Sequence, residues 1–118
     1  MEEKIVKITV NALDSKKAQN LKVLKVEELT SIADYFVLAN GTSSTQIKAL
    51  ADEVEFKLEQ EGIKIDHREG YADGRWVLLD YGSVIIHVFH PEAREFYNLE
   101  KLWADATEVD AKQYIEIK

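Results

Sequence analysis

The sequence predicts one α/β domain of the α+β kind, with a mixed sheet of about five strands flanked by helices. Three observations support this fold class. The chain has 118 residues, the size of one domain, and its hydrophobic content of 46% is enough for a packed core. Segments of strand composition alternate with segments of helical periodicity. No repeat, low-complexity tract or linker divides the chain. We therefore treat 1–118 as a single domain, with a core over about 21–106 and a tail over 107–118.

The N-terminal third predicts a helix followed by two strands. Apolar residues recur at helical spacing from the start of the chain, which predicts a helix ending near Asn20. These residues are Ile5, Ile8, Ala12 and Leu13. The stretches "LKVLKVEEL" (21–29) and "ADYFVLANG" (33–41) are rich in Val, Leu and aromatic residues and predict strands. Their short connection favours antiparallel pairing.

The stretch "TSSTQIKALADEVEFKLEQEG" (42–62) predicts the clearest helix. Ser43 suits the N-cap with Gln46 as its reciprocal partner, and Gly62 suits the position after the last turn. The apolar stripe consists of Ile47, Leu50, Ala51, Val54 and Leu58. The following "IKIDHR" (63–68) alternates in polarity and predicts an edge strand. The order strand, helix, strand predicts a right-handed crossover and a parallel pair of 33–41 with 63–68.

The stretch "DGRWVLLDYGSVIIHVFH" (73–90) predicts a β-hairpin. A two-residue turn at Tyr81-Gly82 would pair Asp80 with Ser83 and Trp76 with His87. One face is then aliphatic and consists of Val77, Leu79, Val84, Ile86 and Val88. The mixed face consists of Trp76, Leu78, Asp80, Ile85, His87 and Phe89. The aliphatic face is core, whereas the pattern leaves the mixed face open between core and docking surface.

A further helix follows in "HPEAREFYNLEKLW", where Pro91 suits the first turn. Its expected packing surface consists of Phe96, Leu99, Leu102 and Trp103. The last stretch, "VDAKQYIEIK", suits a short strand or a loose tail.

Composition and charge limit the classes of function. The chain has no cysteine, which excludes disulfides and thiolate metal sites. No stretch approaches the roughly 18 apolar residues of a membrane span, and the N-terminus does not resemble a secretory signal. We therefore expect a cytoplasmic protein without a membrane partner. The net charge of −7 favours a basic protein partner over sequence-specific nucleic-acid binding.

The residues that could carry chemistry do not converge. The loop "NGTSSTQ" precedes a helix N-terminus, but it lacks both common phosphate-binding glycine motifs and its polar residues suit a capping box. His87 and His90 are three residues apart on a strand, so they point to opposite faces and would not bind one metal. Asp80 lies too far from His87 for a catalytic dyad. We predict no catalytic residues, metal or cofactor.

Three motifs together resemble the RsfS/Iojap family of ribosomal silencing factors. They are "GTSS" before the long helix, "WVLLDYGSVIIHVF" in the hairpin and "REFYNLEKLW" after it. The resemblance runs from about Leu21 to Trp103. The chain departs from the family pattern at Ser83, where an acidic residue is usual.

The resemblance implies a nucleotidyltransferase-like sheet without that superfamily's catalytic carboxylates, and a protein that is not an enzyme. It implies binding to ribosomal protein L-fourteen on the large ribosomal subunit, steric blocking of small-subunit joining and repression of translation. Organellar relatives assist large-subunit assembly, and homodimers are common in the family. Carried onto this chain, the docking residues are Trp76, Leu78, Asp80, Tyr81 and Gly82, with His87 facing the same way.

Two other functions stay open at the level of sequence. One is a nucleotide-binding enzyme on a nucleotidyltransferase-like domain, with "NGTSS" as its phosphate loop. The other is a dimerisation module in which the Trp76 face is the self-contact.

Overall fold

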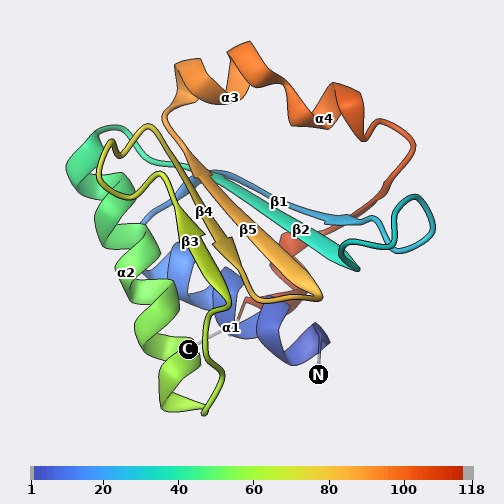
Figure 1. Cartoon of the computed structure of the whole chain (residues 1–118), viewed down its shortest axis with the longest axis horizontal. Helices are drawn as coiled ribbons and strands as arrows, with labels where there is room; N and C mark the ends of the chain where they lie inside the picture. Colours follow the sequence, from blue (N-terminus) through green and yellow to red (C-terminus); the bar gives the residue numbers. More distant parts are fainter. Residues whose placement is uncertain (1, 116–118) are drawn as a thin grey trace.

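A six-stranded mixed sheet forms the centre of the protein, with strand order β3-β4-β5-β2-β1-β6 (Figure 1). The computed structural model describes residues 2–115. Its elements are α1 (Glu2–Ser15), β1 (Gln19–Lys25), β2 (Tyr35–Asn40), α2 (Ser44–Gln60), β3 (His67–Glu69), β4 (Trp76–Asp80), β5 (Val84–Phe89), α3 (Pro91–Tyr97), α4 (Leu99–Leu102), β6 (Thr107–Val109) and the 3₁₀ helix η1 (Ala111–Tyr114). The predicted α+β class is confirmed, with one strand more than expected. No helix within residues 2–115 is long and apolar enough to cross a bilayer.

The parallel pair of the sheet lies at its centre. β2 pairs with β5 in parallel, whereas β3 pairs antiparallel with β4 at the edge of the sheet. The predicted pairing of 33–41 with 63–68 is therefore wrong, although 63–68 does lead into an edge strand. The physical reason is burial. All six residues of β2 are buried and β5 is buried at all but one position, so these strands need cover on both faces. All three residues of β3 are exposed.

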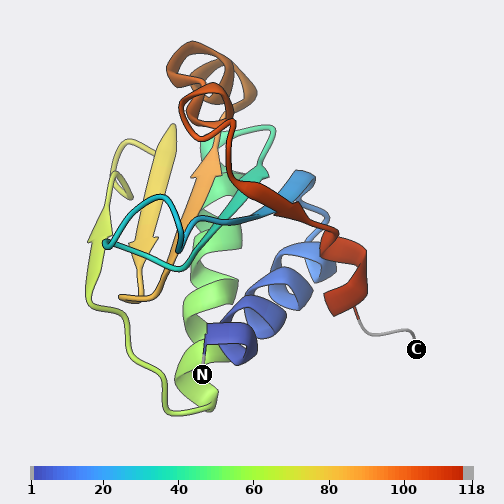
Figure 2. The same cartoon turned by 90° about the vertical axis from the view of Figure 1, so that its right-hand side faces the viewer.

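The two faces of the sheet are covered differently. Helices α1 and α2 lie together on one face, and Figure 2 shows both on the same side of the strands. Their apolar residues pack there against the predicted aliphatic face of the hairpin. The opposite face carries a smaller apolar cluster that includes Phe36, Leu38 and Phe89. Helices α3 and α4 lie at one end of this second face (Figure 1).

The hairpin keeps its predicted faces but not its predicted register. Tyr81 N–H donates to the Val84 carbonyl at 3.0 Å, so the turn residues are Gly82 and Ser83. Asp80 pairs with Ile85 and Trp76 with Phe89. The predicted Tyr81-Gly82 turn is wrong because the first turn position here has a left-handed backbone (φ +82°), which Gly82 adopts easily. The partner of each residue shifts by two, so every side chain stays on its predicted face.

The first and last helices end earlier than predicted. α1 ends at Ser15 rather than near Asn20, because Lys17 adopts a left-handed backbone (φ 63°) and the chain turns into β1. The helix predicted after Pro91 divides at Asn98, which is left-handed (φ 44°) and caps both α3 and α4. This division turns Phe96 and Leu102 outward, at 81% and 72% exposure. Only Leu99 and Trp103 of the expected packing surface contact the second cluster.

The predicted tail continues the fold. β6 adds a strand to β1, pairing Val109 with Val23. η1 then lies against α1, where Asn11 Nδ2 donates to the Tyr114 carbonyl at 2.7 Å. Within the stretch predicted as a short strand or loose tail, only Val109 belongs to a strand, and Ala111–Tyr114 form the 3₁₀ helix; residues 116–118 lie outside the described part of the chain.

Candidate docking surface

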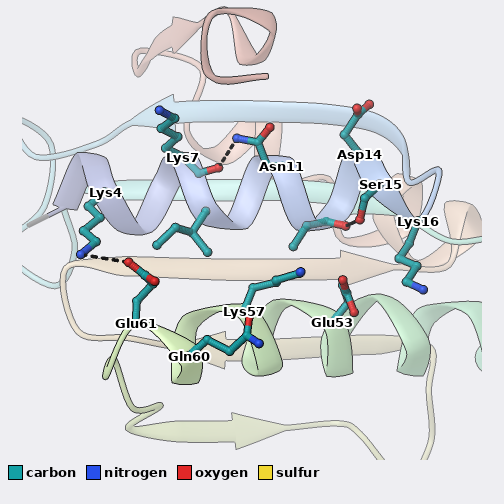
Figure 3. A pocket seen from close by; sticks show the side chains of 12 residues that line it. Lys4, Lys7, Asn11, Asp14, Ser15, Lys16, Glu53, Lys57, Gln60 and Glu61 are labelled. Atoms are coloured by element: carbon teal, nitrogen blue, oxygen red, sulfur yellow. Dashed lines mark hydrogen bonds and ion pairs between the residues drawn. The ribbon is translucent and has the colours of Figure 1, made fainter. Parts of the chain in front are cut away.

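A groove of about 940 Å³ lies between α1 and α2 (Figure 3). Its charged lining consists of Lys4, Lys7, Lys16 and Lys57 with Asp14, Glu53 and Glu61. The two signs alternate, and Lys4 Nζ lies 3.3 Å from Glu61 Oε1 across the opening. A hollow lined by both signs does not concentrate a field of one sign, so it offers no clear preference for an anion or a cation.

The loop before α2 uses its polar groups within the chain. Ser43 Oγ accepts a hydrogen bond from Gln46 N–H at 3.1 Å, which confirms the predicted N-cap. The reciprocal bond differs, because Gln46 Oε1 accepts from Thr42 N–H at 2.6 Å rather than from Ser43. Gly41 N–H donates to the Phe89 carbonyl. The N–H groups of Gly41, Thr42 and Gln46 are thus engaged in the sheet and in capping.

Trp76 lies on the second sheet face beside the end of α3. It begins β4, it is half-buried, and its ring lies 5.1 Å from Phe89 and 4.7 Å from Tyr97, centroid to centroid. These two rings hold the indole, and part of the side chain stays accessible. Trp76 is therefore neither a core residue nor a freely exposed one. A partly supported aromatic ring of this kind is typical of an interface anchor.

His87 lies directly beneath Trp76. The indole N–H of Trp76 donates to Nδ1 of His87 at 3.1 Å, although the two residues are diagonal rather than opposite in the ladder. His87 is only 5% exposed, and burial lowers its pKa from 6.5 to about 4. Its imidazole is therefore neutral near pH 7.

Leu78 and Ile85 extend the surface beside Trp76. Both are half-buried, and they occupy neighbouring rows of the sheet, where Leu78 pairs with His87 and Ile85 with Asp80. Acidic groups border this apolar area. Asp80 is half-buried, and exposed Glu69 lies opposite Leu78 on the edge strand. The result is a small apolar patch with an acidic rim, which we call the Trp76 patch (Trp76, Leu78, Ile85, Asp80 and Glu69).

The other predicted docking residues lie elsewhere. Tyr81 is 8% exposed and packs in the core cluster on the α1–α2 side of the sheet, where burial raises its pKa. Gly82 is exposed at the tip of the hairpin, and its N–H donates to Asp80 Oδ1 at 2.8 Å. The structure thus brings together Trp76, Leu78 and Asp80, with His87 below them.

The sequence did not identify Tyr97 as part of this surface. Tyr97 is 54% exposed, contacts the Trp76 ring, and stands edge-on to Phe96 at 5.1 Å. Their neighbouring positions in the sequence could have indicated this, because two consecutive residues on a helix point in different directions and do not both face the same core. One of them had to reach the surface near the end of α3.

Catalytic and metal-binding arrangements are not formed at this site. Asp80 Oδ1 is engaged by Gly82, and His87 Nδ1 by Trp76. His90 Nδ1 accepts from Glu92 N–H and caps α3. Across the described part of the chain, no group of three or more His, Asp or Glu side chains is placed to hold a metal ion.

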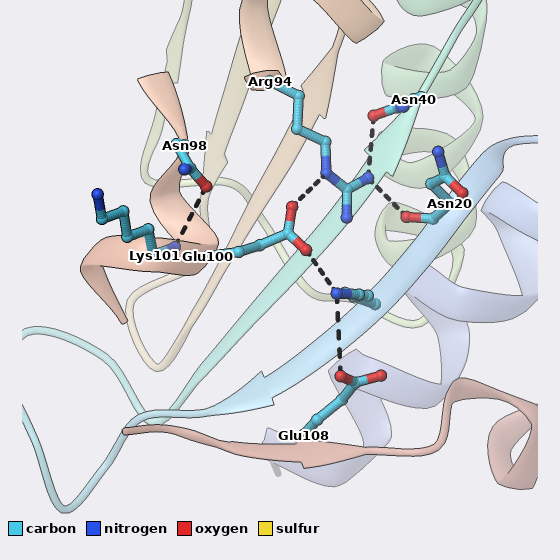
Figure 4. A network of polar contacts seen from close by, with 8 residues as sticks. Asn20, Asn40, Arg94, Asn98, Glu100, Lys101 and Glu108 are labelled. Carbon is cyan, nitrogen blue, oxygen red and sulfur yellow. Dashed lines mark hydrogen bonds and ion pairs between the residues drawn. The ribbon is translucent and has the colours of Figure 1, made fainter. Parts of the chain in front are cut away.

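A polar network holds α3 and α4 beside the patch (Figure 4). Arg94 is 8% exposed and donates to Glu100 Oε1 at 2.8 Å, to the Asn20 carbonyl at 2.6 Å and to Asn40 Oδ1 at 2.9 Å. Lys22 Nζ lies 2.6 Å from the second oxygen of Glu100. The bond from Arg94 holds the pKa of the Glu100 carboxyl below its ordinary value. The network fixes the end of α3, and therefore the place of Tyr97.

Comparisons with known proteins agree with the resemblance in the motifs. A family model described as "Ribosomal silencing factor during starvation" matches residues 1–118. The ribosomal silencing factor RsfS of Halalkalibacterium halodurans is 42% identical over 96% of this chain and 97% of its own length. A crystal structure of a Chromobacterium violaceum protein matches with a TM-score of 0.86 at 38% identity, covering 88% of this chain and 87% of that one. The chain therefore belongs to the ribosomal silencing factor family.

Proposed function

We propose that this protein binds ribosomal protein L-fourteen on the large ribosomal subunit and thereby prevents the small subunit from joining, which represses translation. The observation that carries the proposal is the half-buried Trp76 on the second sheet face, supported by Tyr97 at the end of α3. Membership of the ribosomal silencing factor family supports it. The cytoplasm is the corresponding site of action.

The chemistry of the Trp76 patch suits a basic protein partner. Trp76 supplies a rigid aromatic anchor, and Leu78 and Ile85 supply the apolar area that excludes water around it. Asp80, Glu69 and a net charge of −7 attract a positively charged partner and raise the rate of encounter. Gly82 lies at the adjacent hairpin tip and can join the contact, His87 supports Trp76 from beneath, and Tyr81 is in the core on the other face of the sheet.

The mechanism needs no chemical step. A bound protein that covers part of the surface used by the small subunit prevents joining by occupying it. Repression then depends on affinity and on the amount of factor relative to large subunits.

Co-sedimentation with isolated large subunits tests the proposal. Trp76→Ala is expected to weaken binding by about thirtyfold or more, the level of an interface hot spot. Phe56→Ala is the matched control, because Phe56 is 54% exposed on α2, away from the patch. Equal binding by the parent and the folded Trp76 variant would refute the assigned surface.

Large-subunit assembly is a second candidate function. A relative named "Mitochondrial assembly of ribosomal large subunit protein 1", from mouse, is 32% identical over 83% of this chain, which spans 44% of that protein. An assembly role predicts that cells lacking the factor accumulate incomplete large subunits. A silencing role predicts complete subunits and excessive joining during starvation.

Two further alternatives have direct tests. Micromolar binding of ATP with Mg²⁺ in calorimetry would support the nucleotide-binding enzyme. A homodimer that buries Trp76 between copies would support the dimerisation module, and light scattering of the Trp76→Ala variant would then report a monomer.

A further inference from the structure

The indole N–H of Trp76 points into the sheet rather than toward a partner. It donates to Nδ1 of His87 at 3.1 Å, and His87 is 5% exposed. The indole ring is also held between Phe89 and Tyr97. One hydrogen bond and two ring contacts together restrict both torsions of the Trp76 side chain.

His87 is an unfavourable residue for a core position. Its surroundings are aromatic, with Phe36 edge-on at 5.3 Å and Phe89 stacked at 5.7 Å. Its Nε2 is buried and has no hydrogen-bond partner among the described residues. Since Nδ1 accepts from Trp76, Nε2 carries the proton, and a buried N–H without an acceptor is destabilising. A phenylalanine ring would fill the same space without this cost.

We propose that His87 is a positioning residue that fixes the indole of Trp76 in the orientation that the docking surface presents. The unpartnered Nε2 lowers the stability of the fold. The compensating benefit is the fixed orientation of Trp76 at the surface and not better packing of the core. An anchor held in one orientation before binding loses less conformational entropy when the partner arrives. The consequence for ribosome binding rests on the proposed function, whereas the orientation of Trp76 does not.

Nuclear magnetic resonance of the protein alone tests the orientation. The expected result is a scalar coupling across the hydrogen bond between the indole nitrogen and Nδ1, with slow exchange of the Trp76 indole proton. His87→Phe should remove the coupling, speed the exchange and increase the mobility of the Trp76 ring. His87→Asn, whose carbonyl oxygen lies near the position of Nδ1, should restore much of the protection.

Binding and stability together separate positioning from a structural role. His87→Phe is expected to weaken binding to large subunits about three- to tenfold, the cost of ordering one side chain on binding. Its melting temperature should be equal or higher. Thr9→Val is the matched control, because Thr9 Oγ1 is the other buried atom without a partner among the described residues and lies on α1, away from the patch. It should raise stability without changing binding.

Three results would overturn the proposal: no coupling in the parent protein, an equally ordered Trp76 ring in His87→Phe, or equal binding by that variant. If the parent protein shows the coupling but does not bind large subunits, the proposed function fails and the positioning of Trp76 stands.

Discussion

Replacing Arg94 should destabilise the protein more than replacing any exposed arginine. Arg94 connects three segments, because its guanidinium bonds to Glu100 in α4, to the Asn20 carbonyl in β1 and to Asn40 in β2. Arg94→Met keeps most of the aliphatic stem and removes these bonds. The perturbation is therefore electrostatic rather than a loss of volume.

The size of the stability loss depends on which hydrogen-bond partners of Arg94 remain solvated or paired in the variant. The Glu100 side chain is 28% exposed and retains Lys22, so its loss is small. Asn40 is only 3% exposed, and its Oδ1 loses the hydrogen bond that Arg94 donates. A buried acceptor left unpaired costs about 1–3 kcal/mol, and breaking a buried charge pair costs about 3–5 kcal/mol. We expect a loss of about 3 kcal/mol in the free energy of unfolding.

Urea unfolding, followed by circular dichroism and by tryptophan fluorescence, measures this loss. Domains of this size have about 5–15 kcal/mol of stability, so the variant should remain folded with a clearly lower midpoint. Arg75→Met is the control, since Arg75 is exposed before β4. A loss below about 1 kcal/mol for Arg94→Met would refute the role assigned to the network.

Two further predictions concern His87 and the glycine turns. Burial lowers the pKa of His87 from 6.5 to about 4, so the unfolded state binds a proton that the folded state does not, and the free energy of unfolding falls as the pH drops from about 6.5 toward 4. The fall over this range is about 3 kcal/mol. His87→Phe lacks it, so chemical unfolding at several pH values should show the parent protein losing stability relative to this variant; parallel curves would contradict the assignment. Gly70→Ala should cost at least about 2 kcal/mol more than Gly62→Ala. Both glycines are left-handed (φ +78° and +76°), but only the carbon added at position 70 clashes with the Trp76 carbonyl oxygen, whereas nothing lies within 4 Å of the carbon added at position 62. Calorimetric melting of the two variants measures the difference, and equal melting temperatures would show that the turn at Gly70 relaxes freely.

The hairpin shows what alternation along a strand can predict. The faces of Trp76, Leu78 and His87 were predicted correctly because a register error of two residues leaves every side chain on its own side. The register itself depended on which residue adopts the left-handed turn position. Gly82 occupies it, and local composition alone did not distinguish it as the first rather than the second turn residue.

Local sequence patterns could not predict the order of the strands in the sheet. The sequence correctly indicated that α2 forms a crossover, but not that β5, rather than the nearer β3, lies beside β2. That choice depends on total burial, since β5 needs cover on both faces and β3 does not. The division of α3 from α4 at Asn98 was missed for a related reason. One left-handed residue within a helical segment hardly changes the spacing of the apolar residues, so the sequence pattern does not reveal it.

The Trp76 patch was predicted only in part. The motifs pointed to Trp76, Leu78 and Asp80, which the fold does place together. Tyr81 is separated from them by the parity of the strand, since it follows Leu79 to the core face. The contact between Trp76 and Tyr97 depends on where α3 packs against the sheet. The spacing of residues within β4 or within α3 does not predict that position.

The parallel pairing of β2 with β5 affects how the protein folds during its synthesis. During synthesis β1 and β2 can pair once Asn40 has left the ribosome, but the other edge of β2 stays uncovered until residues 84–89 have also left it. Every residue of β2 is buried in the finished fold. For that interval an apolar strand with an open edge is attached to a translating ribosome, and an open apolar edge is prone to aggregation. The β4–β5 hairpin is the element that covers it.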